Sequence, residues 1–232
     1  MKLENRLTIH AGINFVLSSL PGLDRNRCRK FEEELEGVSI NISSAAYSER
    51  EFVVARQTPT PLEIKIIVIG PQIGQLLIIA PQPGRSLEVL QAEADDIAKA
   101  FSNVWPAPSR QILACDATIR DLYETNSQHA FKELWENRLR QTSDELKSLG
   151  RPVLGGGLRF VMPPQPDLSQ PAIEIKIESF LSDVTKLFLE TQFAWQQPSL
   201  PGIALDPTDR LTTVDNYIQK EVVNFVLENK QP

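Results

Sequence analysis

The sequence is poor in the residues that most often carry chemistry at a site. Its 232 residues include only two cysteines and two histidines. Cys28 and Cys115 stand in segments of unlike character, with no spacing that suggests a zinc site or a redox pair. We expect both thiols to be reduced, which favours a cytoplasmic protein.

Long hydrophobic runs are also lacking. Residues 1–6 have no apolar core of the kind found in signal peptides, and no apolar run approaches the about 20 residues that cross a bilayer. The formal net charge of -6 argues against an anionic membrane or a nucleic acid as the default partner. We therefore expect a soluble protein with no membrane partner, for which nucleic acid is an unfavoured partner.

No motif for cofactor binding is present. The run Gly155-Gly156-Gly157 suggests a phosphate-binding loop, but a P-loop continues with Lys-Ser or Lys-Thr and a helix start. Here Leu158-Arg159-Phe160 follows, which has the pattern of a strand. We interpret the glycines as a turn between a helix and a strand.

The isolated polar residues do not form a catalytic pattern either. His10 lies within a predicted strand and His129 in the first turn of a predicted helix, and neither belongs to a known motif. Cys115 lies in an apolar strand, where a buried and inert thiol is the more common case. We therefore predict no catalytic residue, no cofactor and no metal site, and we favour a protein that is not an enzyme.

What the sequence does contain is a repeat. The stretch Leu62-Glu63-Ile64-Lys65-Ile66 returns 111 residues later as Ile173-Glu174-Ile175-Lys176-Ile177. Residues 62–78 align with residues 173–189 without a gap, and each copy holds two strand-like runs. The connections, residues 70–74 and 181–185, have a length that suits a hairpin. The pattern predicts two copies of one β-hairpin.

Periodicity predicts further elements around each hairpin. In the first half they are a strand over residues 7–20, a helix capped by Asp24 and ended by Gly37, strands over 38–42 and 52–55, and a helix from Ser86 to Val104. In the second half they are a strand over 111–117, a helix over 127–149, a strand over 158–162, and a helix over 213–228. Both halves thus have the order strand, helix, strand, hairpin, helix.

This order predicts an α+β fold. It is a tandem βαβββα pseudo-repeat, with antiparallel sheets and helices packed on one face of them. Trp105-Pro106-Ala107-Pro108 breaks the chain between the copies. Residues 1–106 then form the first unit and residues 107–232 the second, within one compact pseudo-symmetric fold. One joined sheet and two packed sheets are both compatible with the pattern.

The element order resembles the internal repeat of sliding DNA clamps and, more loosely, the doubled strand-helix-strand modules that bind small effectors. The clamp resemblance implies nucleic-acid binding through helices with a basic exposed face. The first helix has Arg25, Arg27, Arg29 and Lys30, but the helix after the first hairpin is acidic. No motif residue of either family is matched, so neither supplies a site, and clamp-like binding ranks third among the functions considered.

Two groups of side chains are candidates for an interaction surface. In the second copy, Glu174, Lys176, Glu178 and Glu190 project to the face opposite the isoleucines. That face is either a solvated surface with weak cross-strand ion pairs, worth about 0.2–1 kcal/mol each, or a charged surface that binds a partner.

In the first copy, Ile67 and Ile79 align with Glu178 and Glu190. Together with Ile69 and Leu77 they form an apolar face, which a partner or a second subunit can cover. The two copies are therefore expected to differ in chemistry on the same face.

These features favour a non-enzymatic interaction protein, an adaptor or assembly factor that binds a protein partner or forms a homodimer. The alternative is a small-molecule-binding module or a cryptic enzyme. Its pocket is expected between the two repeats, lined by Trp105, Trp135 or Trp195.

Overall fold

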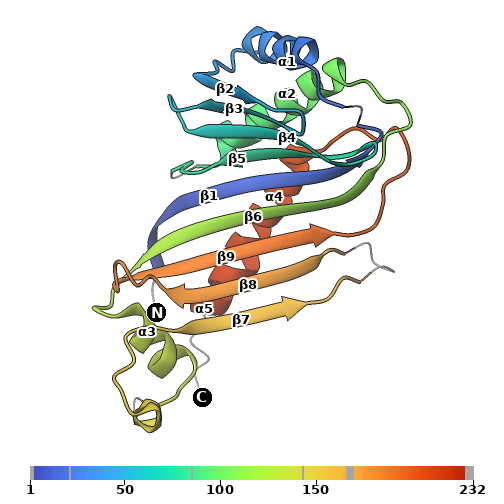
Figure 1. Ribbon diagram of the computed structural model, residues 1–232. Helices are drawn as coiled ribbons and strands as arrows, with labels where there is room; N and C mark the ends of the chain where they lie inside the picture. Colours follow the sequence, from blue (N-terminus) through green and yellow to red (C-terminus); the bar gives the residue numbers. More distant parts are fainter. Residues whose placement is uncertain (1–2, 21, 85, 143, 166–169, 228–232) are drawn as a thin grey trace.

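The computed structural model describes residues 3–20, 22–84, 86–142, 144–165 and 170–227. A nine-stranded antiparallel sheet forms its centre, in the order β2-β3-β4-β5-β1-β6-β9-β8-β7 (Figure 1). The bounds are β1 Leu3–Ser18, β2 Ser44–Tyr47, β3 Glu51–Arg56, β4 Leu62–Gly70, β5 Ile73–Ala80, β6 Ile112–Thr125, β7 Gly157–Met162, β8 Ala172–Ser179 and β9 Lys186–Trp195. The fold is therefore α+β, and its strands form one sheet rather than two.

Strands β1 and β6 lie side by side at the centre of the sheet. Alternate residues of β1, among them Ile13, Phe15 and Leu17, are buried on one face. Cys115 and Ile119 of β6 are buried as well. The strand predicted over residues 111–117 continues to Thr125, because β6 pairs with β1 on one side and β9 on the other along its length.

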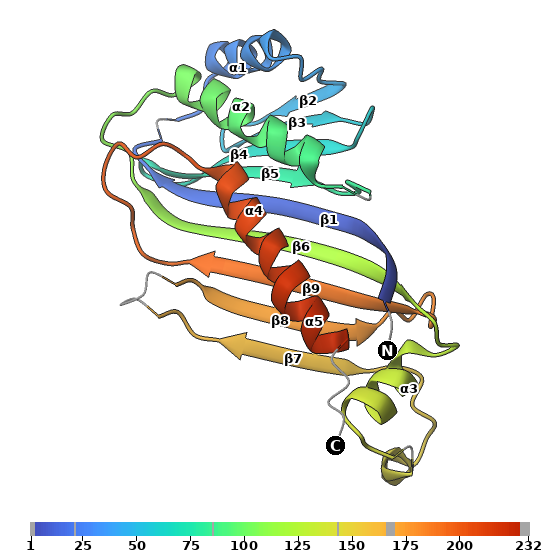
Figure 2. The same cartoon turned by 180° about the vertical axis from the view of Figure 1, so that it is seen from behind.

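The long helices all lie on one face of the sheet (Figure 2). They are α1 (Arg25–Gly37), α2 (Glu88–Val104), α4 (Pro207–Tyr217) and α5 (Val223–Leu227), the last two joined by a π-helical turn at Ile218–Val222. The short helix α3 (Ala130–Glu133) contacts β8 and β9 near one end of these strands. The other face of the sheet has no helix over it in the described part of the chain (Figure 1).

Both helices of the first half begin and end close to where the sequence predicts. The Asp24 side chain accepts a hydrogen bond of 2.9 Å from the Arg27 N–H, as an N-cap residue does. Ser86 Oγ accepts one of 3.1 Å from the Glu88 N–H at the start of α2. Phe31 of α1 packs edge-on against Trp105, which follows α2 and is completely buried.

The C-terminal helical segment connects the two hydrophobic cores. Leu211 and Val214 belong to a large core that also contains β1, β3, β4, β5, α1 and α2, while Val222 and Val226 belong to a smaller core beneath β8 and β9. The segment begins at Pro207, before the predicted start at residue 213, because proline is well suited to the first turn of a helix. Its predicted end at residue 228 lies outside the described residues.

The strand predicted over residues 38–42 is wrong. After α1 the chain turns through Ser39, which has a left-handed backbone with φ of 66°. The Ile40 N–H donates to the Leu35 carbonyl at 2.9 Å. This turn buries Ile40 in the core, and the strand β2 begins only at Ser44.

The single helix predicted over residues 127–149 is also wrong. Helix α3 passes into a π-helical turn at Leu134–Arg138, and a separate 3₁₀ helix follows at Glu145–Leu149. Between them the Gln141 N–H donates to the Trp135 carbonyl, and Arg140 has a left-handed backbone with φ of 56°. The chain reverses there, so the apolar spacing does not form one buried stripe and Leu149 is 67% exposed.

Both predicted hairpins are present, but their registers differ. Lys65 of β4 lies opposite Leu77 of β5, whereas Lys176 of β8 lies opposite Glu190 of β9. The first hairpin turns through Pro71-Gln72 and the second through a longer connection between Ser179 and Lys186. The gapless alignment is therefore wrong across the turn: Leu77 and not Ile79 has the position of Glu190.

Gly74 of β5 leaves room for the side chain of Leu20, which follows β1, to pack against the first hairpin. A Cβ atom at Gly74 would lie 2.0 Å from a Leu20 methyl carbon and 2.7 Å from the Ile67 carbonyl oxygen. We expect Gly74→Ala to lower the free energy of unfolding by about 1–3 kcal/mol in urea denaturation, because the backbone must move. Gly22→Ala is the matched control, since nothing lies within 4 Å of its Cβ position. Equal stability of the two variants would contradict the packing.

Candidate functional site

The face of the sheet that the helices leave open collects the residues singled out in the sequence. Glu174, Lys176 and Glu178 of β8 alternate with Ile175 and Ile177, which face the helices. Ile67, Leu77 and Ile79 likewise alternate with the buried Ile66, Leu76 and Ile78. One surface thus carries both candidate groups. The charged group lies over β6, β9, β8 and β7, and the apolar group lies over β4 and β5.

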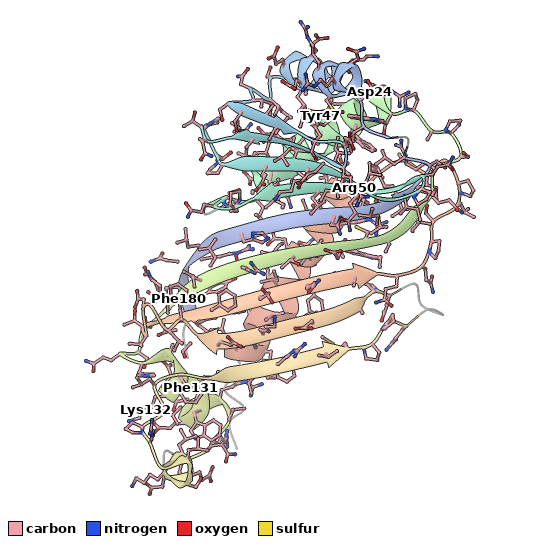
Figure 3. The ribbon with its side chains drawn as sticks, viewed as in Figure 1. Asp24, Tyr47, Arg50, Phe131, Lys132 and Phe180 are labelled. Carbon is pink, nitrogen blue, oxygen red and sulfur yellow. The ribbon has the colours of Figure 1, made fainter. Side chains whose placement is uncertain are left out.

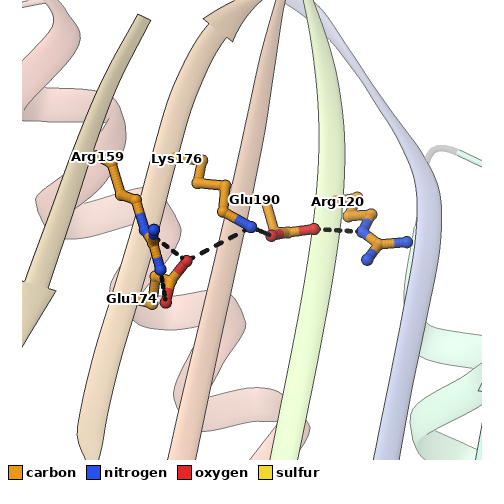
Figure 4. A network of polar contacts seen from close by, with 5 residues as sticks. All are labelled: Arg120, Arg159, Glu174, Lys176 and Glu190. Carbon is orange, nitrogen blue, oxygen red and sulfur yellow. Dashed lines mark hydrogen bonds and ion pairs between the residues drawn. The ribbon is translucent and has the colours of Figure 1, made fainter.

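Five charged side chains form a row across four strands, which we name the charged row (Figure 4). Its members are Arg120 of β6, Glu190 of β9, Lys176 and Glu174 of β8, and Arg159 of β7. Register explains the row, because Arg120 lies opposite Glu190, which lies opposite Lys176, which lies opposite Arg159.

The charges of the side chains alternate in sign along the charged row. Arg120 Nε and Lys176 Nζ each donate to one oxygen of Glu190 at 2.5 Å. Arg159 donates to both oxygens of Glu174 at 3.0 Å, in a bidentate pair. Lys176 Nζ is also 3.4 Å from Glu174. Every charge in the row therefore has an opposite charge beside it.

The row holds its acids ionised. Burial opposes the charge of Glu190, which is 8% exposed, but hydrogen bonds from Lys176 and Arg120 outweigh it, so the pKa of Glu190 lies below its ordinary 4.5. The hydrogen bonds from Arg159 lower the pKa of Glu174, and the hydrogen bond to Glu190 raises the pKa of Lys176. Glu190, Glu174 and Lys176 are therefore charged at neutral pH.

His10 extends the charged row onto β1, where it lies opposite Arg120. Burial first, and then the charge of Arg120, lower the pKa of His10 below 6.5. The ring is therefore neutral at neutral pH. His10 lies within β1, beyond the Arg120 end of the charged row. Two residues along β1, Gly12 lies opposite Ile79 of β5.

The apolar group is smaller than the sequence predicts. We name Ile67, Leu77 and Ile79 the apolar strip; all three are half-buried on the open face. Ile69 is 53% exposed near the end of β4, where the ladder is irregular. The strip is bordered by Glu63 and Lys65, which form an ion pair of 2.7 Å. Glu178 is exposed, lies opposite Phe188, and is not part of the charged row.

A buried polar cluster on the other face was missed by sequence reasoning. Asp121 of β6 is 0% exposed and accepts a hydrogen bond of 2.6 Å from Thr8 Oγ1. Arg6 Nε lies 3.0 Å from Asp121, and Arg6 Nη1 donates to Asp215 of α4 at 2.6 Å. Strict alternation through Ala117 and Ile119 would have placed Asp121 on the core face, had the predicted strand been extended. The cluster fixes α4 to the two central strands.

Ionisation of Asp121 costs free energy in the folded protein. Burial raises its pKa, and Arg6 and Thr8 offset that effect in part. A raised pKa means that the charged form opposes folding, and this cost is lost as the pH falls through the folded-state pKa.

We expect Arg6→Met to destabilise the protein by about 3 kcal/mol near neutral pH, because it leaves a buried carboxylate without its cation. The double variant Arg6→Met/Asp121→Asn should recover most of that loss. In urea denaturation, the gap between the single and double variants should narrow as the pH falls through the raised pKa of Asp121, because Asp121 takes up a proton. A gap that does not change with pH would contradict the pairing.

The cysteines and histidines do not lie together. Burial raises the pKa of Cys28 to about 11 and that of Cys115 to about 12, so both thiols are protonated. His129 caps α3, its Nδ1 accepting from the Lys132 N–H at 3.4 Å. Within the described residues, no group of three or more metal-binding side chains is present, and no helix is long and apolar enough to span a membrane.

The triple glycine, interpreted from the sequence as a turn between a helix and a strand, also allows close packing. A Cβ atom at Gly157 would lie 2.1 Å from the Ile177 carbonyl oxygen, and one at Gly156 would lie 2.9 Å from the Phe131 ring. These glycines carry the chain from the 3₁₀ helix into β7. They are part of the packing between α3 and the sheet.

The three tryptophans do not line one pocket. Trp105 is 0% exposed within the large core, and Trp195 lies beneath the guanidinium of Arg210. Trp135 lines a cavity whose described walls come from residues 129–153. This cavity lies within the second half of the chain, and a pocket between the two halves stays a prediction.

Comparison with protein-family models and with curated protein sequences found no match for this chain.

The charged row gives a testable electrostatic contribution. We expect Glu190→Gln to lower the free energy of unfolding by about 1–2 kcal/mol at neutral pH, because Arg120 and Lys176 lose a shared carboxylate. A depressed pKa stabilises the fold above the ordinary 4.5, and that stabilisation is lost as the pH falls through the lowered value. The deficit of the variant should therefore vanish in acid.

Glu178→Gln is the matched control for Glu190→Gln. Glu178 lies on the same sheet face but is exposed and outside the charged row, so its change is expected to stay within about 0.5 kcal/mol. Urea titrations of both variants at several pH values measure the difference. Similar losses at the two positions would contradict the assigned contacts.

Proposed function

We propose that this chain is a non-enzymatic protein-interaction protein, of the adaptor or assembly type, which binds a protein partner or a second copy of itself on the open face of its sheet. One observation carries the proposal: the helices cover a single face, and the opposite face bears an apolar strip beside a charged row. A cytoplasmic location is part of the proposal and is supported by two free, buried cysteines.

A tandem βαβββα repeat is also part of the proposal. From the centre outward the sheet reads β1-β5-β4-β3 on one side and β6-β9-β8-β7 on the other. In both directions a central strand pairs with the last strand of a hairpin, and that hairpin pairs with one further strand. Strand β2 and the broken helical segment after β6 are differences between the copies. The repeat supports residues 1–106 and 107–232 as its two units.

The chemistry of the open face supports a protein partner. A sheet face that stays in water is usually polar, with apolar residues on the covered side only. The first half departs from this rule at Ile67, Leu77 and Ile79, while the corresponding face of the second half has Glu190 and Gln192 opposite Lys176 and Glu174. A partner with an apolar centre and a charged margin would complement such a face.

Leu77→Glu tests the open face without removing a core residue. The new carboxylate would lie opposite Lys65, the arrangement that Glu190 and Lys176 already have in the second hairpin. We expect the native chain to form a complex heavier than its 26.0 kDa monomer in light scattering, or to retain a protein in a pull-down. The variant should keep its melting temperature and weaken the complex by roughly tenfold or more.

Leu200→Glu is the control, because Leu200 is 73% exposed and lies in the loop after β9. It should leave the complex unchanged. A native chain that is monomeric at micromolar concentration and retains no partner would contradict the proposal. So would equal weakening by the two variants.

A further inference from the structure

A second candidate site lies where α3 meets the 3₁₀ helix, and its chemistry differs from that of the open face. It is a cavity of about 560 Å³, within the range of pockets that hold small molecules. Its lining residues are His129, Phe131, Lys132, Trp135, Leu146, Lys147, Gly150, Arg151, Pro152 and Val153. Figure 3 labels Phe131 and Lys132, which lie together at the α3 end of the molecule.

The charge of this lining is opposite to that of the chain. Lys132, Lys147 and Arg151 are cationic, and the lining holds no carboxylate, although the formal net charge of the chain is -6. Three cations around one cavity raise the local potential for an anion, since the low-dielectric walls concentrate the field.

Few carboxylates compete for these cations. Lys132 Nζ lies 3.8 Å from Glu136, and Lys147 Nζ lies 2.6 Å from Asp144, with both lysine side chains largely exposed. Exposed pairs of this kind are worth little, so an incoming anion can replace them. Within the described residues, Arg151 forms no ion pair with a carboxylate.

The floor of the cavity is apolar and held in place. The rings of Phe131 and Trp135 have centroids 5.9 Å apart, and Leu146, Pro152 and Val153 complete the wall. The indole N–H of Trp135 donates to the Thr142 carbonyl at 3.1 Å, which fixes the ring. Gly156 packs directly behind the ring of Phe131. A flat or apolar group can therefore enter a preformed site.

We propose that this cavity binds a small amphiphilic anion: an aromatic or other apolar body that carries a carboxylate or a phosphate. The body lies against Phe131 and Trp135, and the anionic group is held by Arg151, Lys132 and Lys147 through charge-assisted hydrogen bonds. The site is separate from the open face of the sheet and does not depend on the protein-interaction proposal.

The chain contains three tryptophans, so ¹⁵N-labelled protein gives three indole N–H signals in NMR. Trp135→Phe assigns the signal of Trp135, and the buried Trp105 reports on the core. The probes are indole-3-acetate and phenyl phosphate, titrated against their neutral counterparts indole-3-acetamide and phenol. The two anionic arms distinguish a carboxylate ligand from a phosphate ligand.

We expect at least one anionic probe to shift the Trp135 signal and to bind roughly tenfold more tightly than its neutral counterpart. Added salt should weaken that binding. Arg151→Gln and Lys132→Ala should each weaken it several-fold, without moving the Trp105 signal. Lys30→Ala, which removes an exposed lysine of α1, is the matched control and should have no effect.

Three results would overturn this proposal. The first is the absence of any Trp135 shift with either anion at millimolar concentration. The second is equal affinity for anionic and neutral probes, which would leave only an apolar cavity. The third is an equal loss from Lys30→Ala and Arg151→Gln, which would show that the net charge of the chain, and no local site, governs binding.

Discussion

The rest of the structure depends on the pairing of β1 with β6. These are the longest strands, and each also pairs with the last strand of a hairpin, β5 on one side and β9 on the other. Their ladder makes one sheet out of two halves of the chain. The buried Thr8 and Asp121 and the partly buried Arg6 lie on the same two strands, and Arg6 attaches α4 through Asp215. Loss of this pairing would divide the large core, because that core takes residues from both halves.

Because the strands form one sheet, the helices can cover one of its faces and leave the other open for binding. The helices bury one face, and the opposite face presents a contrast between the apolar strip and the charged row (Figures 1 and 4). The three cations and two carboxylates of the charged row pair with one another and leave a net charge of only +1, so the row is better suited to defining a partner's orientation than to strong attraction. The cavity at Trp135 has the opposite character, with cations around an apolar floor and no carboxylate among its described lining residues. The two surfaces are therefore suited to different ligands.

Local patterns predicted the elements whose packing is itself regular. The alternation in Glu174-Ile175-Lys176-Ile177 located both hairpins, and the stripe of Leu90, Ile97 and Phe101 located α2. Asp121 was missed because Arg6, which pairs with both Asp121 and Asp215, is distant from them in sequence, and only the fold brings the three together. The helix predicted over 127–149 failed because an apolar spacing does not reveal a chain reversal at Arg140. Lys132, Lys147 and Arg151 follow no periodicity in the sequence, so only the folded chain shows that they line one cavity.

The most direct test of the β1–β6 pairing is native-state hydrogen exchange of the backbone amides. We expect the amides of β1 and β6 to exchange most slowly. The free energy of opening measured from their exchange should equal the free energy of global unfolding measured in urea. Exchange of these amides well below the global free energy, with one half opening while the other stays protected, would show that the two halves fold independently. That result would contradict the single cooperative sheet on which the open face, and the function proposed for it, depend.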